Sequence, residues 1–168
     1  MADLRIEHVF ETTDDGFWKL FFDPEYNRKL FLETLGFESW KIASFDESDS
    51  RIERVVDVVP KVGELPGPLK KLAEGGAGYR ERDSFDKAQK RMKVTIEPSA
   101  LQGKLTIGGT MYTKPEGDRR VRRIYDTSVV AKVFGVGGMI ENRILSEVKT
   151  SYDQAAVFTN RWIKEKGL

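Results

Sequence analysis

The beginning of the chain alternates between apolar and charged positions with a period of two. In the stretch LRIEHVFE, Leu4, Ile6, His8 and Phe10 fall on one side, and the residues between them are mostly charged. Such alternation is typical of a strand with one buried face. We therefore expect a strand here, with His8, the single histidine of the chain, on its buried face.

The pattern then changes to that of short helices. Thr12 or Thr13 precedes a pair of aspartates and an aromatic-rich stretch, which favours a capped helix with an acidic first turn. Asp23 and Pro24 suit an N-cap and a first helical position, and Gly36 suits a helix end. The sequence thus predicts two short helices directly after the first strand.

A long region of strand-like sequence follows. Its stretches are joined mostly by short polar turns, one of them at residues 115–117, and strands joined in this way pair antiparallel. A segment rich in proline and leucine interrupts the region, and its residues 68–74 favour a short amphipathic helix. The predicted strands of this region cover residues 37–46, 50–60, 79–86, 90–98, 103–117 and 118–133.

The end of the chain has the periodicity of a single long helix. Apolar residues recur at three- and four-residue steps from Gly138 to Lys166, a segment that would be roughly 40 Å long at 1.5 Å per residue. These elements predict an α+β fold, in which a curved antiparallel sheet of about seven strands surrounds the C-terminal helix. A length of 168 residues favours a single domain over residues 1–168.

The glycine-rich stretch FGVGGMIENRIL raises the question of a nucleotide-phosphate loop. Gly135 and Gly137 fit the first two positions of a Gly-x-Gly-x-x-Gly fingerprint, but the third falls on Ile140, and no strand follows the helix. A Walker loop would require Gly-Lys-Ser/Thr, which is absent here. We therefore interpret Gly135, Gly137 and Gly138 as a sharp corner that lets the helix approach the sheet, and we expect no nucleotide cofactor.

With this interpretation, the order of elements resembles the helix-grip fold of the START and Bet v 1-like superfamily. The stretches VAKVFGVGGMIENRI and AAVFTNRWI are similar to the end of a bacterial family of uncharacterised START-like proteins, the DUF2505 group, and LPGPLKK resembles its Leu-Pro insertion. This chain departs from the family pattern at Phe134, where proline is usual, and at Val157, where glutamate is usual. The resemblance covers essentially the whole chain.

The resemblance implies a single START-like domain with a cavity for a hydrophobic ligand between sheet and helix. It carries over no catalytic residue, because no established catalytic motif is associated with that group. The expected partner is therefore a hydrophobic or amphipathic, lipid-like small molecule. The sequence leaves the oligomeric state open.

Composition narrows the possible partners, cofactors and cellular locations of the protein. The 28 basic and 27 acidic residues nearly cancel, which argues against nucleic acid as the main partner. The chain has no cysteine and one histidine, so we expect no metal site and no other cofactor. No apolar run approaches the roughly 20 residues of a membrane span, and no secretory signal is evident. We expect a cytoplasmic protein without stable membrane insertion, for which transient membrane contact stays open.

Alternation also predicts which side chains face the interior. On residues 104–113 one face carries apolar side chains and glycine, and on residues 120–131 the interior face carries an arginine and a tyrosine. Arg54 and Glu81 share faces with apolar neighbours on other predicted strands. Met139 and Arg143 lie one turn apart at the start of the long helix. The predicted ligand-binding residues are Arg54, Glu81, Ile107, Gly109, Met111, Arg123, Tyr125, Met139 and Arg143.

The inward charges among these candidates need partners, because a buried unpaired charge is costly. We expect Arg123 or Arg143 to hold the polar end of an amphipathic ligand, with Glu81 as the partner when the site is empty. The alternative is that these charges reach solvent at strand ends or form a structural ion pair, with no role in binding.

Three functions are compatible with these observations. The first is a binding or carrier protein for a hydrophobic or amphipathic small molecule. The second is an enzyme of the polyketide cyclase or aromatase type, which would need an acid–base pair such as His8 with Glu81 or Asp83. The third is an interaction module with a packed core and no cavity. A hydrogen bond between His8 and a cavity carboxylate would favour the enzyme.

Overall fold

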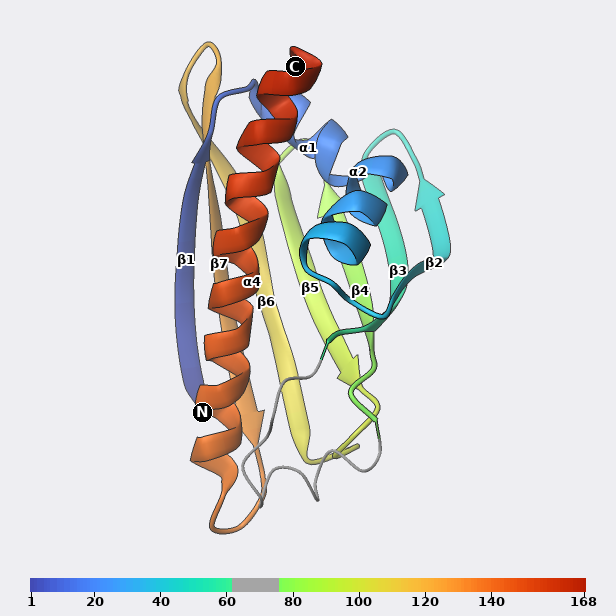
Figure 1. Ribbon diagram of the computed structural model, residues 1–168, viewed down its shortest axis with the longest axis vertical. Helices are drawn as coiled ribbons and strands as arrows, with labels where there is room; N and C mark the ends of the chain where they lie inside the picture. Colours follow the sequence, from blue (N-terminus) through green and yellow to red (C-terminus); the bar gives the residue numbers. More distant parts are fainter. Residues whose placement is uncertain (62–75) are drawn as a thin grey trace.

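Seven strands form one antiparallel sheet, and one long helix lies across a face of it (Figure 1). The computed structural model describes residues 1–61 and 76–168. The helix predicted at residues 68–74 and the LPGPLKK segment lie outside these residues. The order of the strands in the sheet is β1-β7-β6-β5-β4-β3-β2. Their bounds are Ala2–Phe10, Ser39–Glu47, Arg51–Val59, Tyr79–Asp86, Arg91–Pro98, Leu105–Gly117 and Arg120–Ala131 for β1 to β7.

The helices lie on one side of this sheet (Figure 1). Thr13 caps α1 by accepting a hydrogen bond from the Gly16 backbone, and Asp23 caps α2 through the Tyr26 backbone, as expected for these residue types. Gly36 adopts the left-handed conformation after the π-helical turn that follows α2. The bounds are Asp14–Phe21 for α1, Pro24–Arg28 for α2, Lys29–Thr34 for the π-helical turn η1 and Gly137–Lys166 for α4.

One predicted turn lies two residues further along the chain. Strand β6 continues through the turn predicted at residues 115–117, and the chain reverses between Gly117 and Arg120. The pairing of β6 with β7 is irregular between Pro115 and Gly117. Proline lacks a backbone N–H, so a strand tolerates it where the ladder is interrupted.

The glycine corner before α4 is structural, as the sequence indicates. Gly135 has a φ of 79°, a conformation that favours glycine. A Cβ atom on Gly137 would lie 2.5 Å from the backbone oxygen of Ala131, so only glycine allows the helix to start this close to β7. Gly138 has no neighbour within 4 Å of such an atom and needs no glycine.

The core lies between the sheet and the helices, and its strand residues come from β1 and from β3 to β7. Helix α4 packs against β1 and β7, and not against β3, β4 or β5 to a comparable extent. Aromatic side chains of α1 fill the space above β4, where the Trp18 ring stacks on Phe85 at 4.2 Å. The indole N–H of Trp18 donates to the Thr113 hydroxyl at 2.9 Å. This arrangement closes one end of the space between helix and sheet.

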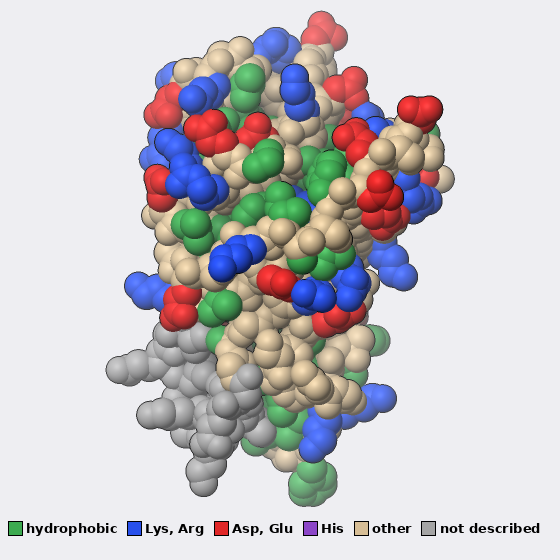
Figure 2. Space-filling view, turned by 90° about the vertical axis from the view of Figure 1, so that its right-hand side faces the viewer, with side chains coloured by type: hydrophobic (Ala, Val, Ile, Leu, Met, Phe, Trp, Pro, Cys, Tyr) green, Lys and Arg blue, Asp and Glu red, His purple; other side chains and the backbone are tan. Residues whose placement is uncertain are grey.

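The other face of the sheet is charged. Arg122 points outward and pairs with Glu116 and Glu7, whereas Arg123, the next residue, is buried. The arginine run of β7 is therefore divided between two faces. Figure 2 shows acidic and basic side chains interspersed over the side of the molecule that carries the β2 edge. The described residues of that side present no continuous basic patch in this view.

Candidate ligand-binding site

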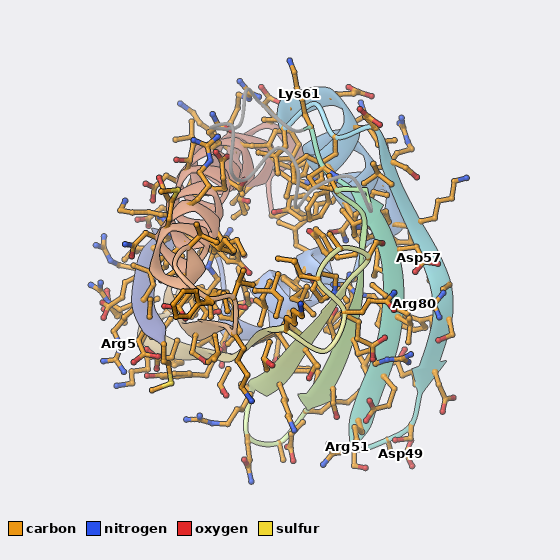
Figure 3. All side chains as sticks on the ribbon, turned by 90° about the horizontal axis from the view of Figure 1, so that it is seen from below. Arg5, Asp49, Arg51, Asp57, Lys61 and Arg80 are labelled. Carbon is orange, nitrogen blue, oxygen red and sulfur yellow. The ribbon has the colours of Figure 1, made fainter. Side chains whose placement is uncertain are left out.

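A cavity of about 600 Å³ lies between α4, the short helices and the sheet. In Figure 3, which views the molecule from below, α4 stands on one side and the sheet on the other, and side chains surround the space between them. The cavity exists because the curved sheet departs from α4 beyond β7, while α1, α2 and η1 cover only one end. Its apolar wall includes Leu20, Leu30, Phe31, Ile96, Ile107, Ile140, Ile144 and Val148.

Six of the nine predicted site residues line this cavity, and three do not. The inward parity predicted for β6 and β7 is correct, because Ile107, Arg123 and Tyr125 all face the helix side. The six lining residues are Arg54, Glu81, Ile107, Arg123, Tyr125 and Arg143.

Gly109, Met111 and Met139 are the three that do not line it, for different reasons. A Cβ atom on Gly109 would lie 2.4 Å from the Asp126 backbone oxygen and 2.7 Å from the Tyr125 ring, so that ring covers the glycine. Met111 is buried in the packed core. Met139 retains 48% of its surface exposed in the first turn of α4. The prediction for the two strand residues is wrong because parity identifies a face but not the depth along it, and that for Met139 is wrong because helical spacing does not fix the rotation of α4.

Arg54 and Asp83 form a buried ion pair at the wall of the cavity. The Nε and Nη2 atoms of Arg54 donate to Oδ2 of Asp83 at 2.9 and 2.7 Å. The guanidinium also lies 4.9 Å from the Phe21 ring centroid and 5.1 Å from that of Phe22. Because β3 and β4 place Arg54 opposite Asp83 in register, the pair is built into the sheet.

Glu81 extends this pair toward the cavity. One of its oxygens lies 3.8 Å from Arg54 Nη2, and the side chain keeps 24% of its surface accessible. Burial, followed by the charge of Asp83, raises the pKa of Glu81 to about 8. Oδ1 of Asp83 is buried and has no donor among the described residues. Glu81 lies two residues before Asp83 on the same face of β4, and in its protonated form it carries an O–H group able to act as such a donor.

His8 connects Arg123 to the surface. Arg123 Nη2 lies 2.7 Å from His8 Nδ1, and His8 Nε2 lies 2.8 Å from Asp153 Oδ1. A guanidinium can only donate, so Nδ1 accepts and Nε2 carries the proton that it donates to Asp153. Burial, and then the charge of Arg123, lowers the pKa of His8 and favours this neutral form.

These contacts correct two expectations. His8 contacts Asp153, a half-exposed residue of α4, and not Glu81 or Asp83, so the acid–base pair expected for an enzyme does not form. The expected partnership of Glu81 with Arg123 or Arg143 is also wrong. Glu81 lies beside Arg54, whereas Arg123 contacts His8 and Arg143 pairs with Glu147. Antiparallel pairing of β1 with β7 places His8 directly opposite Arg123.

Three tyrosines add polar groups to the cavity wall. Tyr79, Tyr125 and Tyr152 all line it, and burial raises the pKa of each hydroxyl, so all three remain protonated donors at neutral pH. The Tyr125 and Tyr152 rings stack with their centroids 5.0 Å apart. Tyr79 and Tyr152 are missing from the predicted site, although Tyr79 shares a face with Glu81 and Tyr152 belongs to the apolar stripe of α4.

Arg143 lies on α4 at the wall of the cavity near its N-terminal end. Its Nη2 atom lies 2.7 Å from Oε1 of Glu147, one turn along the helix. Both residues line the cavity. The charge of Arg143 is therefore balanced within its own helix.

The family model described as "Protein of unknown function (DUF2505)" matches residues 5–163 of the chain. The chain belongs to this family. The match confirms the resemblance seen in the corner and in the C-terminal helix. No curated protein matches the chain.

Several solved structures are similar to this chain and share its helix-grip fold. The Zhui aromatase/cyclase from Streptomyces sp. R1128 superimposes with a TM-score of 0.72 at 11% identity, covering 99% of this chain and 96% of that one. Norcoclaurine synthase from Thalictrum flavum gives 0.66 at 18% identity, covering 98% and 87%. A conserved protein from Geobacillus kaustophilus gives 0.59 at 16% identity, covering 98% and 96%. At these identities the likeness establishes the fold.

Proposed function

We propose that this DUF2505 protein is a binding or carrier protein that takes a hydrophobic or amphipathic small molecule into the cavity between sheet and α4. The observation that carries the proposal is the cavity itself. Its volume of about 600 Å³ falls within the roughly 300–1,000 Å³ of small-molecule sites, and its wall has the same mixture of apolar surface with a few polar groups.

The remaining interpretations are less well supported. An interaction module with a packed core requires that no such cavity exist, and the volume of the cavity argues against it. A cytoplasmic location and transient contact with a membrane remain predictions from the sequence. Within the described ranges, no helix is long and apolar enough to cross a membrane.

A titration with the neutral fluorophore N-phenyl-1-naphthylamine tests the proposal. Its fluorescence should rise on binding to the wild type. Ile107→Trp places a larger ring in the cavity and should weaken binding about tenfold, a loss of roughly 1.4 kcal/mol. Thr106→Trp, on the exposed face of the same strand, is the matched control and should bind like the wild type. No binding by the wild type, or equal binding by Ile107→Trp, would contradict the proposal.

A second candidate function rests on Glu81. A carboxyl group that faces a cavity and has a pKa of about 8 is suited to exchange a proton near neutral pH. This supports an enzyme of the cyclase type, although His8 has no part in it. The test is turnover of a linear polyketone thioester: Glu81→Gln should abolish cyclisation and leave probe binding intact. Equal product with both proteins, or none with the wild type, would remove this candidate.

A further inference from the structure

Arg123 is a buried cation whose hydrogen-bond partner is neutral. Its side chain lines the cavity with 5% of the residue's surface exposed. Nη2 donates to His8, but Nε is buried and has no acceptor among the described residues. The faces of Phe10 and Tyr152, 5.1 and 4.8 Å from the guanidinium carbon, provide the remaining contacts. The charge is thus held in an apolar setting with unused donor capacity.

The other arginines of the cavity wall differ in having a carboxylate partner, although Nε of Arg143 is also buried without an acceptor among the described residues. Arg54 is paired with Asp83 at 2.7 Å, and Arg143 with Glu147 at 2.7 Å. Arg123 has no carboxylate within ion-pair distance among the described residues. The nearest chain of contacts to an acid runs through His8 to Asp153, which Lys149 also binds.

An uncompensated buried charge is costly, and an incoming anion would offset that cost. His8 fixes the direction of the guanidinium without neutralising it, because its Nδ1 accepts one hydrogen bond and carries no negative charge. Glu81, on the wall of the same cavity, does not repel such an anion near neutral pH, because burial keeps its carboxyl group largely protonated. Arg123 therefore has the charge, the free donor and the orientation of an anion-binding group.

The position of Arg123 also fixes the orientation of the ligand. Arg123 pairs with Thr113 on β6, beside α1, whereas Ile107 pairs with Val129 near the start of α4. Arg123 and Val129 are six residues apart on β7, which corresponds to roughly 20 Å along the strand. The apolar side chains of the cavity wall extend between them, so a hydrocarbon chain has room beyond a head group at Arg123.

We propose that the ligand is an amphipathic carboxylic acid whose carboxylate binds Arg123 at the end of the cavity covered by α1, with its hydrocarbon chain extending toward Ile107 and the start of α4. This inference rests on the proposed binding function and names the chemical class of the ligand. Charge-assisted hydrogen bonds of a guanidinium to a carboxylate are stronger than neutral ones, so the acid should bind more tightly than an uncharged analogue of the same length.

Competition against N-phenyl-1-naphthylamine tests the inference with two ligands of equal chain length, palmitate and palmityl alcohol. The wild type should bind palmitate at least about tenfold more tightly than the alcohol. Arg123→Met should lose this preference and still bind the alcohol. Arg123→Gln retains a donor toward His8 without the charge, and it provides the same comparison should the methionine variant not fold.

Arg122→Met is the matched control, because Arg122 neighbours Arg123 on the same strand but faces outward. It should keep the preference of the wild type. Equal binding of palmitate and the alcohol by the wild type would overturn the inference and leave the binding function standing. A preference that survives in both Arg123 variants would overturn it too, by assigning the anion to another cation. Failure of the wild type to bind the fluorophore or either ligand would overturn the binding function itself.

Discussion

Replacing Glu81 by glutamine should make the stability of the protein less dependent on pH. In the folded protein the proton on Glu81 avoids two adjacent buried negative charges beside one arginine. A glutamine side chain provides a donor to Asp83 at every pH and carries no charge. The substitution therefore imitates the protonated form permanently.

The magnitude follows from the shift in pKa. Burial raises the pKa of Glu81 from 4.5 to about 8, and at about 1.4 kcal/mol per pKa unit this corresponds to roughly 4–5 kcal/mol. Because the folded pKa is the higher one, the folded state binds a proton that the unfolded state releases. The stability from this group is complete below the unfolded pKa and is lost as pH rises from about 4.5 through about 8.

Urea denaturation at about pH 5 and about pH 9 measures the effect. The free energy of unfolding of the wild type should fall relative to that of Glu81→Gln by several kcal/mol between these values. Glu97→Gln is the matched control on β5: hydrogen bonding to Arg82 lowers the pKa of Glu97 from 4.5, so its contribution is lost only at lower pH, and this variant should follow the wild type between the two values. Parallel pH profiles for wild type and Glu81→Gln would refute the assignment of the proton to Glu81.

Three further substitutions test the fold around the site. Asp83→Asn leaves Arg54 buried without its carboxylate and should cost about 3–5 kcal/mol in urea denaturation; a cost below about 1 kcal/mol would contradict the buried pair. Gly137→Ala places a methyl group 2.5 Å from the Ala131 oxygen and should lower stability by about 1–3 kcal/mol, whereas an unchanged melting temperature would refute the close approach. Phe134→Ser alters a fully exposed ring and should change stability by less than about 0.5 kcal/mol; a larger loss would mean that the ring packs.

Much of the fold is predictable because its elements follow local rules. The period-two stretches become strands, the caps at Thr13 and Asp23 form as expected, and the apolar stripe from residue 138 onward becomes α4. The inward direction of Arg123 and Tyr125 also follows from parity alone. Each of these inferences uses residues that are close together in the sequence.

The partners within the site depend on pairings between distant segments. His8 meets Arg123 because β1 pairs with β7, across 115 positions of sequence. Glu81 meets Arg54 because β3 pairs with β4 in one register, and alternation cannot select that register. Met139 is exposed because the rotation of α4 about its axis is set by contacts with β1 and β7. Local periodicity contains no information on any of these three features.

Native mass spectrometry of the protein purified from its own host tests the central claim most directly. If the cavity holds an amphipathic acid, the folded protein should carry a small molecule that is released on unfolding and has the mass of a carboxylic acid. When the emptied protein is incubated with palmitate, a complex with the added mass of palmitate should appear, and it should be less abundant for Ile107→Trp. A spectrum that contains only the bare chain, both from the host and after incubation with palmitate, would contradict the account.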